Sequence, residues 1–236
     1  MSDIMAMDRG NHSLKAALIS GGRITKRWRD ADGSGILTGE SVDLLAFCSV
    51  VPSWSAAIRS VAAAMGVADV REVTSSSGFP FDLAVEHPET TGTDRLCAAS
   101  GAWAEGSREA VIVDAGTAVT VDRLSERGFL GGCIFPGSFM LARALAKDTA
   151  ALPLVEPGED QGEPPGRSTR EAIARGIHWG LIGAVGRLVE MTRGDEGDIP
   201  VFLTGGMAQA LRPHIPGEVR VRPDLVLEGI FALVAG

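Results

Sequence analysis

The sequence predicts an α/β protein made of two similar halves, each with a mixed sheet flanked by helices. A strand–turn–strand pattern that contains Asp-x-Gly occurs twice, at Asp8 and at Asp114. In both halves, three consecutive strands are followed by alternating helices and strands, which is typical of a mixed sheet covered by helices. The 30 glycines are scattered among apolar runs, as expected where tight turns approach a ligand. We expect the ligand to bind in the cleft between the halves.

Composition and charge exclude several functional classes. The net charge of −8 makes nucleic acid an improbable main partner. Cys48, Cys97 and Cys133 are widely spaced and form no Cys-x-x-Cys or Cys/His cluster, so neither a zinc site nor a disulfide framework is expected. The N-terminus lacks the basic segment of a signal peptide, and no apolar run approaches the roughly 18 residues of a membrane span. We therefore expect a cytoplasmic protein without a membrane partner.

The first half is expected to open with a three-stranded meander, because Gly21-Gly22 is a common hairpin turn. A dense apolar strand then stops at Pro52, and helical spacing follows with Ser53 or Ser55 as N-cap. The expected elements are strands over 4–7, 13–19, 23–28, 44–51 and 67–73, and helices over 53–65 and 91–105.

The second half repeats this order after residue 109, so we expect domains over 1–109 and 110–236. The segment 156–168 is rich in proline, glycine and acidic residues and is predicted to be a mobile surface loop. The expected elements are strands over 110–114, 118–124, 128–133 and 200–204, and helices over 138–147, 169–193 and 224–234, with a further helix beginning at 207–211.

Each Asp-x-Gly turn combines residue types that suit phosphate binding. Glycine lets the backbone approach a phosphate closely, and the carboxylate can hold a hydrated cation that bridges phosphates. Asn11, Ser13, Thr117 and Thr120 add hydrogen-bond donors. Asp-x-Gly is also common in ordinary turns. Two copies in equivalent contexts nevertheless favour a function.

A third acidic residue, Asp94, opens a helix within Gly92-Thr93-Asp94-Arg95. Acidic residues in a first helical turn often serve only the helix dipole. Alternatively, Asp94 accepts a proton from a substrate hydroxyl while Arg95 pairs with a substrate anion. In phosphoryl transfer, positioning and charge stabilisation dominate over the strength of the base.

Two glycine pairs admit both a structural and a functional interpretation. The pairs are Gly131-Gly132 and Gly205-Gly206. Each suits either a simple turn or a stretch of backbone that packs against an adenosine group. The second pair lies between a strand and a helix, where a helix N-terminus can face an anion. No P-loop segment is present, and the histidines form no catalytic triad signature.

Taken together, these motifs resemble the type III pantothenate kinases, within the superfamily of acetate and sugar kinases, Hsp70 and actin. The resemblance covers nearly the whole chain and implies two RNase H-like domains with the active site in the interdomain cleft. The similar segments, in chain order, are Asp8–Lys15, Ser49–Pro52, Gly92–Arg95, Asp114–Asp122, Gly131–Gly137, Thr169–Ile177, Thr204–Gly206 and Asp224–Gly229.

The resemblance implies transfer of the γ-phosphoryl group of ATP to pantothenate, the first step of coenzyme A biosynthesis. Asp94 would be the catalytic proton acceptor, and Asp114 would hold a monovalent cation, K⁺ or NH₄⁺, with Mg²⁺ accompanying ATP. The implied ATP-binding residues are Asp8, Arg9, Gly10, Asn11, His12, Ser13, Leu14, Lys15 and Thr117. The implied pantothenate-binding residues are Gly92, Thr93, Asp94, Arg95 and Thr169, the last from the neighbouring subunit of a homodimer.

Three positions depart from the family pattern. His12 stands where the family has threonine, and Val85 and His87 stand where it often has tyrosine and asparagine. Two alternatives therefore stay open. One is a weakly active or inactive relative that binds a nucleotide or metabolite and regulates a partner. The other is a kinase for another small hydroxy acid. The retained acids, together with Arg95, favour catalysis.

Overall fold

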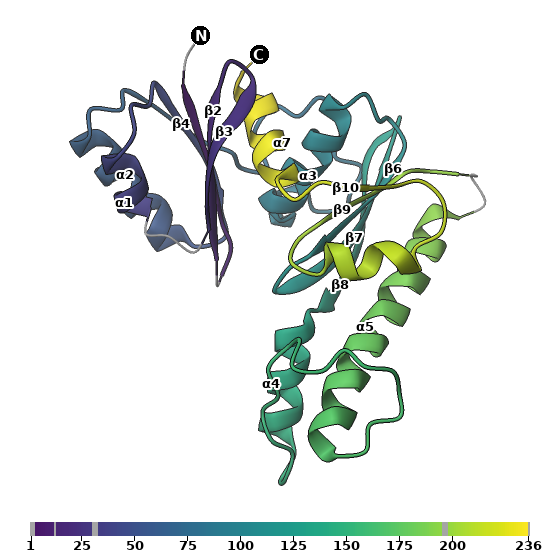
Figure 1. Cartoon of the computed structure of the whole chain (residues 1–236). Coiled ribbons are helices and arrows are strands. Elements are labelled where there is room, and N and C mark those ends of the chain that lie inside the picture. Colours follow the sequence, from purple (N-terminus) through teal and green to yellow (C-terminus); the bar gives the residue numbers. More distant parts are fainter. Residues whose placement is uncertain (1–2, 12, 30–32, 195–197, 236) are drawn as a thin grey trace. The chain divides into compact units, whose positions relative to one another are not determined.

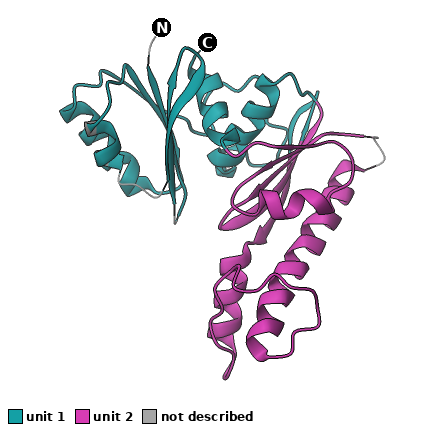
Figure 2. Cartoon of the chain, in the orientation of Figure 1, with its two compact units in different colours: residues 1–108, 124–130, 224–236 teal, residues 109–123, 131–223 magenta. Residues whose placement is uncertain are grey.

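The computed structural model describes residues 3–11, 13–29, 33–194 and 198–235. Figure 1 labels the elements, and Figure 2 shows that the chain forms two compact units. Unit 1 comprises residues 1–108, 124–130 and 224–236, and unit 2 comprises 109–123 and 131–223. This division follows contacts rather than chain order, so the domain limits expected from the sequence remain a prediction. Residues 224–236, which we expected in the second domain, pack within unit 1.

Unit 1 contains a mixed five-stranded sheet. Its central strand β1 pairs antiparallel with β2 on one side and parallel with β4 on the other. The order is β3-β2-β1-β4-β5. The strands are β1 (Ile4–Arg9), β2 (Leu14–Ser20), β3 (Arg23–Arg29), β4 (Leu44–Ser49) and β5 (Asp69–Glu72). All five strands were predicted, with ends that differ by one to two residues.

The second sheet repeats the same arrangement. Its order β10-β9-β6-β7-β8, read from β8, matches the order of the first sheet strand by strand. β9 runs parallel to both β6 and β10. The strands are β6 (Ala110–Ala115), β7 (Ala118–Ser125), β8 (Gly128–Pro136), β9 (Val201–Thr204) and β10 (Val219–Val221). The predicted duplication is confirmed, although the three-residue β10 was not foreseen.

Helices cover both faces of the unit 1 sheet (Figure 1). One face packs Met5, Met7 and Phe47 against α1 (Gly33–Thr38) and α2 (Pro52–Ala64). Because strand side chains alternate, Ala6 and Asp8 point to the other face. That face lies against α7 (Leu225–Val234), which packs on α3 (Thr93–Ala104) and contacts β1, β2 and β4. Asp8 is thereby directed toward the α3–α7 side.

The packing of α7 on α3 explains why the C-terminal residues belong to unit 1. Leu225, Val226, Leu227 and Ile230 of α7 are all buried. A Cβ at Gly101 would lie 2.5 Å from the carbonyl oxygen of Leu225. Glycine therefore lets the two backbones approach more closely than side chains would permit.

The start of α2 corrects one prediction. Val51 occupies the N-cap position without a side-chain hydrogen bond, and Pro52 is the first helical residue. Proline suits this position because its fixed φ matches the helix and its missing N–H would have no partner there. The hydroxyl of Ser55 instead donates to Oε1 of Glu72 at 2.8 Å, which joins α2 to β5. Ser53 and Ser55 are therefore not caps.

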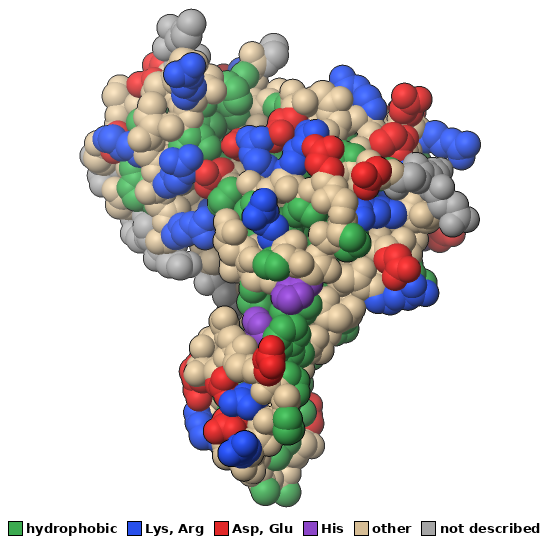
Figure 3. All heavy atoms as spheres, turned by 45° about the vertical axis from the view of Figure 1, so that its right-hand side comes forward, with side chains coloured by type: hydrophobic (Ala, Val, Ile, Leu, Met, Phe, Trp, Pro, Cys, Tyr) green, Lys and Arg blue, Asp and Glu red, His purple; other side chains and the backbone are tan. Residues whose placement is uncertain are grey.

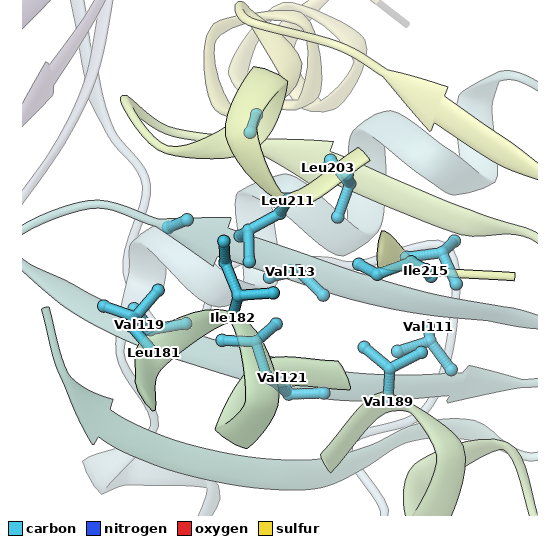
Figure 4. Packing of buried hydrophobic residues seen from close by; sticks show 14 of the residues in the cluster. Val111, Val113, Val119, Val121, Leu181, Ile182, Val189, Leu203, Leu211 and Ile215 are labelled. Carbon is cyan, nitrogen blue, oxygen red and sulfur yellow. The ribbon is translucent and has the colours of Figure 1, made fainter. Parts of the chain in front are cut away.

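In unit 2, the long helix α5 (Thr169–Arg193) packs on the sheet, as Figure 4 shows for Val111, Val121 and Leu181. Its predicted limits are confirmed. Ser168 Oγ accepts from the N–H of Glu171, whose carboxylate accepts from the N–H of Arg167, in the manner of a capping box. The shorter helices are α4 (Ser138–Asp148) and α6 (Ala208–Leu211).

The loop 156–168 lacks helix and strand, as predicted, but it is tied to α5. Arg175 Nε donates to Asp160 at 2.8 Å, and Nη1 donates to the carbonyl oxygens of Glu163 and Pro165 at 2.9 Å each. The indole of Trp179 donates to the carbonyl of Gly162. Hydrogen bonds from Gly162 N–H and then from Arg175 lower the pKa of Asp160. These bonds attach the predicted surface loop to α5.

Among the described residues, no helix is both long and apolar enough to cross a membrane.

Gly229→Ala tests the close approach of α7 to α3. A Cβ at Gly229 overlaps the carbonyl carbon and oxygen of Cys97, so we expect a loss of about 3 kcal/mol in the free energy of unfolding. Gly183→Ala in α5 is the matched control, because nothing lies within 4 Å of its Cβ. It should gain about 0.5–1 kcal/mol. Urea unfolding followed by circular dichroism measures both, and an unchanged midpoint for Gly229→Ala would contradict the packing described.

Candidate active site

The first Asp-x-Gly hairpin connects β1 to β2 in unit 1. Asp8 is 8% exposed and lies opposite Lys15 in the ladder. The turn is closed by a 3.0 Å hydrogen bond from the N–H of Gly10 to the carbonyl of Ser13. Asn11 at the tip is exposed. The hairpin thus places a buried carboxylate beneath an exposed turn.

Two residues of the predicted ATP segment need separate comment. Leu14 is 2% exposed and belongs to the core beneath α1 and α2, so its side chain does not face a ligand. Only its backbone is available to ATP. His12 lies outside the described residues.

A buried thiol lies directly beside Asp8. Cys48 on β4 is the register partner of Asp8, and its Sγ donates to Asp8 Oδ1 at 3.5 Å. The pKa of the Cys48 thiol lies well above its usual value, first because of the hydrogen bond with Cys97 and then because of burial. The negative charges of Asp8 and Asp94 raise it further. Both acids therefore act on one thiol at the carboxyl end of β4.

Asp94 is positioned at the beginning of α3 by a glycine. Its Oδ1 accepts from the N–H of Arg95 at 2.9 Å. A Cβ at Gly92 would lie 2.6 Å from the same oxygen, so a larger residue there would displace the carboxylate. Gly92 therefore leaves room for the Asp94 carboxylate in this position, whereas its φ of −57° would suit any residue.

Arg95 is held against an aromatic ring. Its guanidinium carbon lies 5.5 Å from the ring centroid of Phe129, which is fully buried. Phe129 belongs to the β7–β8 hairpin tip and donates its N–H to the carbonyl of Asp82 at 2.8 Å. Its own carbonyl accepts from the N–H of Ala84 at 2.9 Å. This cation–π contact orients a cation beside the Asp94 turn.

Val85 and His87, which depart from the family pattern, come just after Ala84 in the chain. His87 is exposed, and its Nδ1 lies 3.4 Å from Oε1 of Glu89. Val85 is half-buried.

The second Asp-x-Gly hairpin, in unit 2, is enclosed by glycine turns. A Cβ at Gly205 would lie 2.6 Å from Asp114 Oδ1, and one at Gly116 would lie 3.3 Å from it. The N–H of Gly137 donates to the carbonyl of Thr117 at 3.1 Å, and a Cβ at Gly137 would overlap that carbonyl. Asp114 thus lies in a cradle of backbone that side chains at these positions would fill.

The two glycine pairs differ in role. Gly205, with φ of 86°, packs on the Asp114 hairpin at the end of β9. Gly132 packs on Val121 and Asp122, where a Cβ would overlap the carbonyl of Val121. Gly205 therefore shapes the cradle, whereas Gly132 is explained by contact between β7 and β8.

The donors around Asp114 fit a monovalent cation. The cradle offers one carboxylate together with backbone oxygens of the surrounding turns. Among the described residues, no three His, Cys, Asp or Glu side chains gather in a metal-binding group. Hard cations take oxygen ligands, so the oxygen atoms of this cradle suit such a cation.

Thr169 lies at one end of an apolar groove in unit 2. It is the exposed first residue of α5. The groove has a volume of about 700 Å³ and runs between α4 and α5. Apolar side chains on this part of the surface are visible at the lower end of Figure 3. The groove is lined chiefly by Phe135, Leu141, Leu145, Leu152, Ile173 and Ile177.

Sequence reasoning did not identify Cys48 or Phe129 as parts of the site. Cys48 becomes a neighbour of Asp8 only through the β1–β4 register, which is not visible in the sequence. Phe129 reaches Arg95 through the tip of a hairpin formed by β7 and β8. The apolar strand that ends at Ser49–Pro52, a segment similar to the family pattern, was the one available signal for Cys48.

Comparison with known proteins agrees with this geometry. A model of the type III pantothenate kinase family matches residues 4–191. The type III pantothenate kinase of Zymomonas mobilis is 32% identical over 253 residues, covering 98% of this chain and 91% of the relative. That of Chlorobaculum tepidum is 38% identical over 196 residues, covering 78% and 71%.

Solved structures share the fold at lower identity. A Baf family protein from Campylobacter jejuni superposes with a TM-score of 0.62 at 17% identity, covering 98% of this chain and 97% of that one. A ROK family glucokinase from Streptomyces griseus gives a TM-score of 0.54 at 12% identity, covering 97% of each chain. With the family model matching most of its length, the chain belongs to the type III pantothenate kinase family.

Proposed function

We propose that the protein transfers the γ-phosphoryl group of ATP to the hydroxyl of pantothenate, the first step of coenzyme A biosynthesis. The observation that carries this proposal is that unit 1 holds the buried Asp8 near the end of β1 and Asp94 in the first turn of α3. Two acids held at the carboxyl end of a mixed sheet can serve a metal-bound phosphate and a substrate hydroxyl. Membership of a kinase family supports this reading.

We assign the first hairpin to ATP. Asp8 would hold hydrated Mg²⁺, which would supply positive charge at the phosphates when bound, and the exposed Asn11 of the turn would offer its side-chain amide. Lys15, opposite Asp8, adds a positive charge. Thr117, half-buried at the second hairpin, is assigned to the same nucleotide.

We assign proton transfer to Asp94. The pantothenate hydroxyl oxygen attacks the γ-phosphorus, the bond to the β–γ bridging oxygen breaks, and ADP leaves with that oxygen. Asp94 takes the hydroxyl proton as the new O–P bond forms. Arg95, restrained by Phe129, pairs with the pantothenate carboxylate. Thr93 and Gly92 complete this turn.

Asp114 is proposed to hold the monovalent cation, K⁺ or NH₄⁺. The surrounding carbonyl oxygens and the space left by Gly116 and Gly205 support this role. Such a cation supplies positive charge next to nucleotide phosphates. Gly116 and Gly205 both lie close to Oδ1 of this carboxylate.

The partner is proposed to be a second copy of the chain, seated on the groove between α4 and α5. Apolar grooves of this size on a protein surface mark interaction sites. Thr169 lines the same groove, which supports its assignment to the pantothenate site of the neighbouring copy.

A cytoplasmic location is proposed as well. The three cysteines are free, and two of them are buried. Free thiols suit a reducing compartment.

The first test replaces the proton acceptor. With ATP, Mg²⁺, K⁺ and pantothenate, Asp94→Asn should lower kcat at least about 100-fold, because general base catalysis contributes that much. Its affinity for Mg²⁺–ATP should change less than about twofold, since the amide keeps the shape of the carboxylate. A coupled ADP-release assay measures the rate, and calorimetry measures the affinity.

Glu89→Gln is the control for Asp94→Asn, because Glu89 is an exposed acid on the neighbouring turn. It should retain wild-type turnover. Wild-type turnover no higher than that of Asp94→Asn would overturn the proposed activity. Turnover of a different hydroxy acid alone would favour the alternative substrate, and nucleotide binding without any turnover would favour a regulatory relative.

The second test removes the monovalent cation. In buffers where Na⁺ replaces K⁺ and NH₄⁺, the rate should fall at least about tenfold, as expected when an electrostatic contact to the phosphates is lost. Asp114→Asn should have a low rate that no longer responds to K⁺. Equal rates with and without K⁺ in the wild type would refute the role of Asp114.

The third test asks whether Thr169 acts in trans. Thr169→Ala alone should weaken pantothenate binding more than ATP binding. When it is co-expressed with Asp94→Asn, a mixed dimer contains one site with both Asp94 and Thr169 intact. Activity should then return to about a quarter of the wild-type value, because about half of randomly formed dimers are mixed. Activity no higher than the average of the two separate variants would show that Thr169 acts within its own chain.

A further inference from the structure

Cys48 is a buried side chain of unit 1, and the proposed reaction does not use its thiol. It is 1% exposed, yet its Sγ points to Asp8 rather than only into apolar surroundings. Buried thiols elsewhere usually act as small hydrophobic groups. A buried thiol directed at a carboxylate calls for a different explanation.

The β1–β4 register fixes this contact. Asp8 and Cys48 are direct partners on parallel strands, so both side chains leave the sheet on the same face. The distance from Sγ to Oδ1 is 3.5 Å, which suits a thiol donor. An ionised carboxylate only accepts hydrogen bonds, so the proton must come from the sulfur.

The second sheet has a comparable side chain at the equivalent position. Thr204 on β9 is the register partner of Asp114 and is fully buried. Its hydroxyl donates to the carbonyl of Pro223 at 3.3 Å. In both sheets a small polar side chain therefore stands next to the acid on the adjacent parallel strand.

We propose that Cys48 is a positioning residue, which orients the Asp8 carboxylate toward Mg²⁺–ATP through its S–H hydrogen bond. The inference rests on the proposed role of Asp8. Cys48 itself touches neither nucleotide nor substrate; it acts through Asp8. Loss of the donor frees the carboxylate to rotate, and the arrangement that binds the metal–nucleotide complex is then less populated.

Binding experiments separate a donor from a space-filling group. Cys48→Ala removes the donor and should weaken Mg²⁺–ATP binding about fivefold, the effect of one ordinary hydrogen bond. Cys48→Ser keeps a donor and should stay within about twofold of the wild type. Ile58→Val is the packing control, because it removes one buried methyl group from the α1–α2 face of the same sheet, away from Asp8. It should also stay within about twofold.

Infrared spectroscopy gives a readout that packing alone would not move. The difference spectrum between wild type and Cys48→Ala isolates the S–H stretching band of Cys48. Asp8→Asn should shift that band to higher frequency, since a neutral amide oxygen accepts more weakly than a carboxylate. An S–H band unchanged by Asp8→Asn, or equal losses of affinity in Cys48→Ser and Cys48→Ala, would overturn the proposal.

These outcomes are distinct from failure of the proposed function. If the wild type does not phosphorylate pantothenate but binds Mg²⁺–ATP, the pantothenate assignment fails while the Cys48 variants still decide its role. If Mg²⁺–ATP does not bind either, the S–H band alone decides whether Cys48 donates to Asp8.

Discussion

In each sheet, an acid near the end of the central strand lies opposite a residue of the adjacent parallel strand. The register between these two strands determines which side chain lies beside the acid. In the first sheet this register places Cys48 beside Asp8, and in the second it places Thr204 beside Asp114. Because side chains of register partners share a face, a shift of one residue would direct the acid to the opposite face. The direction in which each carboxylate points therefore depends on the strand pairing.

Close helix packing supplies the other constraint on unit 1. Asp94 depends on the position of α3, and α3 is covered by α7 through backbone contacts at Gly101 and Gly229. The hairpin tip with Phe129 then restrains Arg95. Elements from three distant parts of the chain thus hold the base candidate and its neighbouring cation. This explains why the C-terminal helix belongs to unit 1 rather than to the half in which it is encoded.

Much of this arrangement was predictable from local patterns. The strands around Asp8 and Asp114 were found because apolar runs, glycine turns and duplication agree, and α5 was found because its sequence is amphipathic with helical periodicity. The Ser53 or Ser55 cap was wrong because Pro52 already suits the first helical turn. The attachment of the loop 156–168 was missed, since its composition does not show the ion pairs that Arg175 makes.

The contacts of the site were harder to foresee than its residues. Asp94 and Arg95 were selected from their motif, but their neighbours depend on non-local pairing. Cys48 was considered only as a metal or disulfide candidate, because the sequence does not reveal which strand lies beside β1. Phe129 was missed for the same reason. Strand β10 was not predicted, because its three residues are too few to show a periodic pattern of apolar side chains.

A crystal structure with Mg²⁺, a non-hydrolysable ATP analogue and pantothenate tests the central claim most directly. The account predicts the phosphates and Mg²⁺ at the Asp8 hairpin and the pantothenate hydroxyl within about 3 Å of the Asp94 carboxylate. A bound pantothenate whose hydroxyl lies beyond hydrogen-bond reach of Asp94, with another group in its place, would contradict it.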